Sequence, residues 1–420
     1  MGGHPRTQLV LVCGVSRQDV RRTGDLLRGP GAVLVEHDLR GLAEGVVERR
    51  VTGPDGLDGA WTALELAHGC ISCTVREDLL PLLVRLGRDD TTRRIVLLLD
   101  PAMEPESVCE SMHLVLPEGE DVTVLDVVDI EGAVAVLDAA TWLADATSDD
   151  TLSERGMALT GDDERTVAQV VVGQAEFADV LLLAGEVPEK WDRVRLDAVL
   201  DRLSPRAVRA LLGRGSAVAD LAGLLEVLAP AARRGLPDDP HGPLLRGQPP
   251  LTPEAGVSLV HVEERRPFHP ARLHEAFDVL LAGTVRIRGR VWVASQPETV
   301  LWIESAGGGL QIGHAGAWLA AADAEAWNDA GQDRRVGAAL SWDEQFGDRE
   351  QQLVVLAHEA APADLVAALA GALVTDEELA RGEDAWRTWD DPFGFWHTDP
   401  CESGTPAFLA DDDTRPGGLS

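Results

Sequence analysis

The sequence predicts an α/β protein in which a mostly parallel sheet is flanked by helices and is followed by a smaller α+β domain. A chain of 420 residues is too long for one compact core of ordinary size, so we expect at least two domains. In the first half, continuous apolar runs alternate with amphipathic segments, as in buried parallel strands joined by helices. In the second half, short strand-like runs with turn residues between them indicate an antiparallel sheet.

The first half contains a series of apolar runs that are typical of buried strands, and residues 95–99 form the clearest one. The predicted strands are, in chain order, residues 9–15, 32–35, 95–99, 122–128, 133–137 and 180–183. Helical patterns are predicted at residues 19–27, 164–177 and 194–228. Strands that alternate with helices in this way form a parallel sheet.

A segment rich in Pro, Gly and Asp separates the two halves and is the best candidate for a linker. We expect a first domain at 1–229, a linker at 230–256, a second domain at 257–397 and an acidic, mobile tail at 398–420. The elements predicted in the second domain are a strand at 257–262, a helix at 270–281 and short strands at 284–287, 290–294, 299–304 and 310–313.

The net charge of the chain limits the classes of partner that it can bind. Asp and Glu number 71 against 37 Lys and Arg, which gives a formal net charge of −34. An acidic surface repels phosphate, so we expect neither direct binding to nucleic acid nor docking on an anionic membrane. Five cysteines are too few for a disulfide framework, and no apolar run approaches the roughly 18 residues of a membrane span. The first apolar run is also too short for a signal-peptide core, so we expect a cytoplasmic protein.

The turn after the first predicted strand is where a phosphate-binding loop would lie, but its residues do not suit that role. Such a loop needs several glycines, a Lys for the terminal phosphate and a Ser or Thr for Mg²⁺. Residues 13–20 read CGVSRQDV, and the single lysine of the chain, Lys190, lies far away in sequence. The sequence therefore predicts a degenerate loop at Gly14, Ser16 and Arg17, with no catalytic or nucleotide-binding residue, so that bound GTP and Mg²⁺ are not expected.

The sharpest local feature is a Cys-x-x-Cys pair, Cys70 and Cys73, directly before a predicted helix. Thr74 with Glu77, as a capping box, or Asp78, as the N-cap, is predicted to begin that helix. In either register both thiols lie near the positive end of the helix dipole, which favours the thiolate form.

Three interpretations of this pair stay open. In a metal site, two thiolates bind one tetrahedral ion, and the remaining ligands come from His68, His37 or a carboxylate. In a redox dithiol, the pair would need a thioredoxin-like βαβ context. In a purely structural role, the residues are two small, half-buried cysteines in a turn. The metal site is the leading interpretation, with Cys70, Cys73 and His68 as candidate ligands.

Two features of the second domain receive structural interpretations. The run Pro267-Phe268-His269-Pro270 is predicted to open a helix, because proline suits the first helical turn. The aromatic-rich residues 385–396, AWRTWDDPFGFW, are predicted to cover the core of the domain.

These residues together resemble the CobW family of metal-linked P-loop GTPases over most of the chain. Residues 69–73 (GCISC), followed by 78–80 (DLL), resemble the family's Gly-Cys-x-Cys-Cys element. The segments similar to the CobW C-terminal domain are 266–270 (RPFHP), 286–292 (RIRGRVW), 313–314 (GH) and 390–393 (DDPF). The resemblance implies a P-loop-like first domain, a CobW C-terminal second domain and a zinc-linked function.

The departures from the family pattern fall on every nucleotide motif. Besides the loop at 14–20, residues 98–104 (LLDPAME) replace the Glu-x-x-Gly switch, and residues 184–187 (AGEV) replace the guanine-reading Asn-Lys-x-Asp. Ser72 stands in place of the middle cysteine, and a hydroxyl is a far poorer zinc ligand than a thiolate. Loss of the phosphate, Mg²⁺ and base contacts together argues against nucleotide hydrolysis.

Residues 64–76 (LELAHGCISCTVR) are similar to the actinobacterial Mrf-type branch of the family, whose members recruit a ribosome hibernation factor to ribosomes when zinc is scarce. This resemblance implies a zinc-responsive adaptor without hydrolysis. The acidity of the chain suits a basic protein partner, such as a hibernation factor or a ribosomal protein, with the ribosome contacted indirectly. The alternative is a zinc metallochaperone GTPase, and a thiol oxidoreductase is a third hypothesis.

Overall fold

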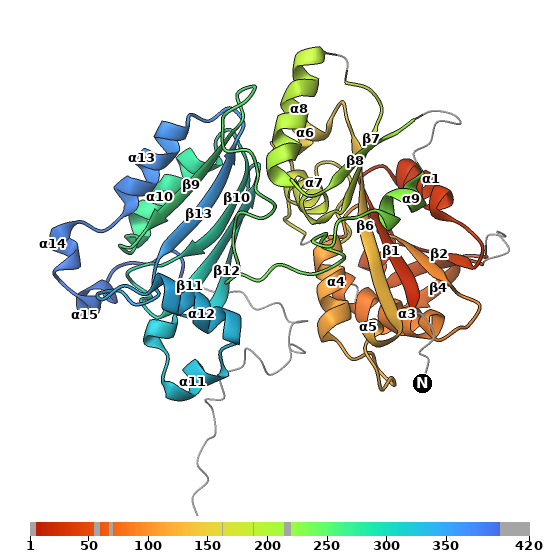
Figure 1. Ribbon diagram of the computed structural model, residues 1–420, viewed down its shortest axis with the longest axis horizontal. Coiled ribbons are helices and arrows are strands. Elements are labelled where there is room, and N and C mark those ends of the chain that lie inside the picture. Colours follow the sequence, from red (N-terminus) through yellow and green to blue (C-terminus); the bar gives the residue numbers. More distant parts are fainter. Residues whose placement is uncertain are drawn as a thin grey trace, which may run out of the picture.

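The computed structural model describes residues 6–53, 59–66, 70–161, 163–187, 189–213 and 220–394, and the structural statements below concern these residues. Figure 1 shows two sheets, each with its own set of helices. Among the described helices, none combines the length and the apolar character that crossing a bilayer requires. His68 and the predicted tail at 398–420 lie outside the described residues.

The first sheet has eight strands in the order β4-β3-β2-β5-β1-β6-β7-β8. Six of them pair in parallel, whereas β3 and β4 extend one edge in the antiparallel sense. The prediction of a mostly parallel sheet is thus confirmed. The strands are β1 Thr7–Cys13, β2 Ala32–Asp38, β3 Val46–Thr52, β4 Thr62–Glu65, β5 Arg94–Leu98, β6 Val128–Asp138, β7 Val180–Ala184 and β8 Val208–Leu212.

Helices cover both faces of this sheet, because successive side chains of a strand point to opposite faces. Leu9 and Leu11 of β1 face the larger core, which includes buried side chains of α3, α4, α7 and α8, whereas Val10 and Val12 face the core under α1 and α9. The helical segments are α1 Arg17–Leu27, η1 Leu42–Glu44, α2 Ile71–Thr74, η2 Val75–Leu79, α3 Leu80–Gly87, α4 Pro105–Leu114, α5 Val124–Val127, α6 Trp142–Ala146, α7 Val167–Phe177, α8 Lys190–Leu203 and α9 Leu221–Glu226.

The second sheet is antiparallel, as predicted, with the order β12-β11-β10-β13-β9. Helices α10 and α13 pack together over one face. The elements are β9 Ser258–Glu264, α10 Pro270–Leu281, β10 Thr284–Val291, β11 Thr299–Ala306, β12 Gly309–Ala317, η3 Leu319–Ala321, α11 Ala324–Asp329, α12 Gln332–Ser341, β13 Gln351–Ala357, α13 Pro362–Ala372, α14 Asp376–Leu379 and α15 Glu383–Trp386.

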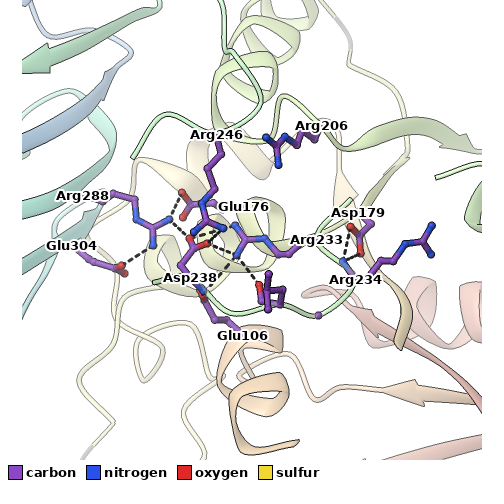
Figure 2. A network of polar contacts seen from close by, with 12 residues as sticks. Glu106, Glu176, Asp179, Arg206, Arg233, Arg234, Asp238, Arg246, Arg288 and Glu304 are labelled. Carbon is purple, nitrogen blue, oxygen red and sulfur yellow. Dashed lines mark hydrogen bonds and ion pairs between the residues drawn. The ribbon is translucent and has the colours of Figure 1, made fainter. Parts of the chain in front are cut away.

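The other face of the second sheet packs against the first domain. Helix α7 contacts β10 and β11, and α8 contacts β13. Val285, Ala306 and Leu356 of the second sheet belong to the same buried cluster as the interior of the first domain. Figure 2 shows the polar part of this interface, where Arg288 of β10 reaches Glu176 of α7 at 3.1 Å and Asp238 of the connecting segment at 2.5 Å.

Four predicted elements are wrong or need correction. Residues 122–127 are a turn and the short helix α5, because Thr123 and Asp126 form a reciprocal capping box, and only Val128 belongs to a strand, as the first residue of β6. Residues 194–228 are not continuously helical, since the edge strand β8 interrupts them. Residues 284–287 and 290–294 are not separate strands, because β10 runs through Gly289 without a turn.

The predicted roles of the aromatic run and of the Pro-flanked turn are confirmed within the described residues. Trp386 and Phe393 are buried, 4% and 7% exposed, and belong to hydrophobic clusters of the second domain. His269 is the N-cap of α10, and Pro270 occupies its first turn. Residues 395–396 of the aromatic run lie outside the described part of the chain.

Candidate functional site

The connection from β1 to α1 is a turn of three residues, Gly14 to Ser16. Gly14 has φ +151°, and a Cβ atom there would lie 2.5 Å from the carbonyl oxygen of Val136 on β6. Glycine is therefore needed for the close approach of the turn to β6. A phosphate loop of the G-x-x-x-x-G-K type spans at least twice this length between strand and helix.

The polar groups of this turn are engaged within the protein. The Ser16 hydroxyl accepts a hydrogen bond from the main-chain N–H of Asp19 and donates one to the Asp19 carboxylate at 2.8 Å. Ser16 is thus an N-cap for α1. Arg17, the first residue of α1, places Nη1 2.7 Å from Oδ2 of Asp100, a buried residue just after β5. Burial raises the pKa of Asp100 although the charge of Arg17 opposes that shift.

A cavity of about 190 Å³ lies at the carboxyl ends of β1 and β6, the edge where open α/β sheets bind ligands. Val15 and Ser16 form one wall, and Trp142 donates its indole N–H to the carbonyl of Val171 at another. Its charged lining residues are Asp138, Asp145 and Arg155. Arg155 pairs with Asp145 at 2.8 Å, so the lining carries a net negative charge that repels phosphate.

The Cys-x-x-Cys pair lies at the start of a continuous helical segment that runs from α2 through η2 to α3. Cys70 is the N-cap, and its Sγ accepts a hydrogen bond from the main-chain N–H of Cys73 at 3.2 Å. The helix therefore begins at Ile71, and the predicted starts at Thr74 or Asp78 are wrong. The cysteine sulfur replaces the hydroxyl or carboxylate oxygen that usually caps a helix.

The two sulfur atoms are 2.8 Å apart, with Cys70 half-buried and Cys73 buried. A tetrahedral zinc ion with two Zn–S bonds of about 2.3 Å separates its thiolates by roughly 3.8 Å. The pair is thus close enough to bind one ion after a small rotation of the side chains. A π-helical turn, Val75–Leu79, follows directly and accommodates Pro81, whose missing N–H would break a regular α-helical bond.

Beside the pair, Asp78 is bound from both sides by residues of the neighbouring strands. Its Oδ2 lies 2.8 Å from Nε2 of His37 on β2, and its Oδ1 contacts the guanidinium of Arg49 on β3. His37 is buried, 7% exposed, and uses one ring nitrogen for Asp78. As a zinc ligand, His37 would have only Nδ1 to offer.

Across the described ranges, with their gaps, no three side chains of His, Cys, Asp and Glu are gathered for a metal ion. Cys70 and Cys73 are brought together as predicted, whereas His68 lies outside these ranges. Sequence reasoning missed the contacts of Asp78 and Asp100, because their partners are distant in the chain. The acidic residue after an apolar strand was the only local signal for Asp100.

Two family models match this chain, one on each of its two domains. The model of the CobW/HypB/UreG nucleotide-binding domain matches residues 42–209, and that of the cobalamin synthesis protein cobW C-terminal domain matches residues 257–373. The protein is therefore of the class in which a nucleotide-binding domain precedes a cobW C-terminal domain. The first match begins after β2, so it leaves out the turn from Gly14 to Ser16 and the helix α1 that starts at Arg17.

Two relatives extend over most of the chain. The protein is 44% identical over 406 residues to a zinc chaperone of Mycobacterium tuberculosis, which covers 94% of this chain and 95% of the relative. It is 30% identical over 340 residues to the zinc-regulated GTPase metalloprotein activator 1 of Dictyostelium discoideum, or 78% of this chain and 70% of the relative. The chain belongs to the CobW family.

A solved structure, the zinc-bound YjiA GTPase from E. coli, covers 88% of this chain and all of its own, with 16% identity and a TM-score of 0.35. A superposition this loose places no residue of that enzyme on this chain.

Proposed function

We propose that the protein is a zinc-responsive adaptor of the CobW family that does not hydrolyse a nucleotide. The observation that carries this proposal is the turn of three residues between β1 and α1, which is too short to cradle a triphosphate. The zinc chaperone and the zinc-regulated GTPase activator among its relatives support a function linked to zinc.

Zinc binds through Cys70, Cys73 and the adjacent His68 in this proposal. The donor set suits the ion, since thiolate sulfur and imidazole nitrogen are its preferred ligands. The position of Cys70 and Cys73 at a helix N-terminus further supports binding, because the helix dipole stabilises thiolates. A set of three protein ligands leaves one coordination position for a water or a partner's side chain. Such an open site suits exchange of the ion.

Loss of hydrolysis is supported by the groups that occupy the phosphate end of the site. Arg17 is paired with Asp100, so this carboxylate already has a counter-ion in place of a hydrated Mg²⁺. Ser16 caps α1 with its hydroxyl, and the nearby cavity presents two carboxylates and one arginine. No lysine lies in this region, since Lys190 begins α8.

The adaptor role rests on the acidity of the chain and on the resemblance of residues 64–76 to the Mrf-type branch. A net charge of −34 favours association with a basic protein, either a ribosome hibernation factor or a ribosomal protein, and disfavours direct contact with rRNA. The protein then joins ribosomes in the cytoplasm through that partner during zinc limitation.

Sedimentation with ribosomes tests the adaptor role. Ribosomes from zinc-depleted cells are pelleted with and without the hibernation factor, and the protein is followed in the pellet. We expect the protein in the pellet only when the factor is present, and less of it as salt rises. A protein that stays in the supernatant under all conditions contradicts the proposal.

A zinc metallochaperone GTPase is the second candidate, and the names of the two relatives favour it. Titration with a fluorescent GTP analogue, with and without Mg²⁺, separates the two functions. The adaptor predicts no saturable binding at micromolar concentrations, whereas the GTPase predicts Mg²⁺-dependent binding and phosphate release. Zinc content is measured in the same samples, because both candidates bind zinc.

A further inference from the structure

A cavity of about 160 Å³ lies where the two domains and the connecting segment meet. The first domain contributes the end of α8 and the turn after it, with Leu203 and Pro205. The second sheet contributes Leu259 and Leu356, and the connecting segment contributes residues between Ala231 and Pro249. Its volume is close to that of a cavity that holds one benzene molecule.

Arginine is the charged residue that dominates this lining, which is unusual in a chain with 71 acidic residues. The six are Arg202, Arg206, Arg233, Arg246, Arg286 and Arg288, against Glu176 and Asp179.

Four of the arginines are neutralised by carboxylates. Arg233 and Arg246 lie 2.8 and 2.6 Å from Oδ1 of Asp238. Arg286 and Arg288 pair with Glu176 and Glu304 at 2.9 to 3.2 Å, as Figure 2 shows for Arg288. These pairs hold the two domains and the connecting segment together and leave little net charge.

The other two arginines have no carboxylate partner in the described parts of the chain. Arg202 donates to the carbonyl oxygens of Ala198 and Thr252, at 2.7 and 2.5 Å, and is only 4% exposed. Arg206 donates to the carbonyl of Ala231 at 3.2 Å. The carboxylate of Asp179 accepts hydrogen bonds from the main-chain N–H groups of Ala133 and Arg234 and forms no ion pair with Arg202 or Arg206 in the described structure. The cavity thus keeps an excess of positive charge.

Unsatisfied donors add to this excess of positive charge beside the cavity. Arg202, Arg286 and Arg288 each have a buried Nε–H group without an acceptor among the described residues. These three atoms are closed off from solvent, so they raise the positive potential near the cavity without contacting a ligand in it. An anion supplies several acceptor lone pairs at once.

We propose that this cavity binds a small anion with a flat apolar body, an aromatic-sized group that carries one carboxylate or one phosphate. The anionic group contacts Arg202 and Arg206, and the apolar body packs against Leu203, Leu259 and Leu356. Because the walls come from both domains, the bound anion stabilises their docking. The site is separate from the Cys70 and Cys73 pair and from the turn at Gly14.

Isothermal titration calorimetry on the full chain tests this site with four probes: benzoate, phenyl phosphate, benzyl alcohol and inorganic phosphate. We expect at least one of the aromatic anions to bind with a Kd below 1 mM, and the uncharged alcohol and bare phosphate to bind at least tenfold more weakly. The relative affinity of benzoate and phenyl phosphate identifies the preferred anionic group.

Variants assign the binding to the cavity. Arg206→Ala, at an exposed position, should weaken binding of the aromatic anion about tenfold, which is about 1.4 kcal/mol of binding free energy. Ala231→Phe, also exposed, should block the cavity, and Arg202→Met should abolish binding if its circular dichroism matches the wild type. Arg85→Ala on α3 is the matched control, because Arg85 is exposed and lines no part of the cavity.

The proposal is overturned if neither aromatic anion binds with a Kd below 1 mM, or if Arg206→Ala and Ala231→Phe bind the anion like the wild type. Equal affinity for inorganic phosphate and phenyl phosphate overturns the apolar part of the site.

Discussion

Arg17 and Asp100 form an ion pair, 2.7 Å between Nη1 and Oδ2, that joins the first residue of α1 to the end of β5. Asp100 is 2% exposed, and its Oδ1 also accepts the main-chain N–H of Ala102. The guanidinium of Arg17 and the N–H of Ala102 both favour the ionised carboxylate and offset part of its desolvation. The same pair links the turn after β1 to the carboxyl end of β5.

Arg17→Ala should lower the free energy of unfolding by about 1–2 kcal/mol at neutral pH, because it leaves a buried carboxylate without its counter-ion. The loss stays modest because the side chain of Arg17 is about half exposed. Burial raises the pKa of Asp100, so the folded state holds this proton at pH values where the unfolded state releases it. Stability therefore falls as pH rises from about 4, and more steeply in the variant.

Urea unfolding between pH 3.5 and pH 8 measures this effect. The difference between the variant and the wild type should shrink toward the acidic end, because Asp100 takes up a proton there in both proteins. Arg6→Ala is the control, since Arg6 and Asp129 form an ion pair that is half exposed on both sides. That variant should lose less than about 0.5 kcal/mol at every pH. A pH-independent loss in Arg17→Ala would contradict the prediction.

Cys70→Ala and Cys73→Ala should each remove about one equivalent of bound zinc. Either substitution leaves one thiolate, and two protein ligands do not hold the ion against a competing chelator. Zinc content is measured by elemental analysis after purification and by competition with a chromophoric chelator. His68→Ala is expected to weaken retention in the same assay.

Cys109→Ala is the matched control for the zinc measurement, because Cys109 is fully buried on α4. It should keep the wild-type zinc content. Equal zinc in the wild type and in both Cys70→Ala and Cys73→Ala would assign a purely structural role to the pair.

Much of the first sheet could be predicted because a buried parallel strand is apolar throughout, as in β5 and β7. β8 escaped prediction because it is an edge strand, with only Leu212 buried, so its residues resemble a helix surface. Residues 122–128 are rich in valine, yet the local capping box of Thr123 and Asp126 outweighs this strand preference.

The candidate site could be predicted only where its partners are close in sequence. Cys70 and Cys73 meet because a spacing of three places both residues at one helical turn. His37 and Asp78 are 41 residues apart, and Arg288 and Asp238 are 50 apart, so their contacts depend on how the sheets pack. No periodicity or spacing in the sequence encodes such contacts.

Asp238→Asn should weaken the docking of the two domains. Burial opposes ionisation of Asp238, but the charges of Arg288, Arg233 and Arg246 outweigh it and lower the pKa of this carboxyl. Removing the negative charge leaves Arg233 and Arg246 without their nearest carboxylate, whereas Arg288 keeps Glu176 and Glu304. We expect a cost of roughly 3–5 kcal/mol. Differential scanning calorimetry should then resolve two transitions in place of one.

The pH dependence of this effect follows from the lowered pKa. The stabilisation is complete above the unfolded pKa of about 3.9 and is lost as pH falls through the lower folded pKa. The variant and the wild type should therefore converge as pH falls through the folded pKa of Asp238. Asp239→Asn is the neighbouring control, because Asp239 is exposed and bonds only a local main-chain N–H in the described structure. A single transition at the wild-type temperature in Asp238→Asn would refute the role of this residue in docking.

Gly289→Ala should disrupt the second sheet. A Cβ atom at Gly289 would collide with the carbonyl oxygen of Gln352 and lie 2.9 Å from Cα of Leu353, both on the paired strand β13. These are backbone atoms inside the sheet, so we expect a loss of about 3 kcal/mol or more, measured by thermal unfolding and soluble yield. Gly313→Ala on β12 is the control, because a Cβ atom there meets no heavy atom within 4 Å, and its stability should change by less than about 1 kcal/mol. Equal stability of the two variants would mean that β10 and β13 separate without cost at this position.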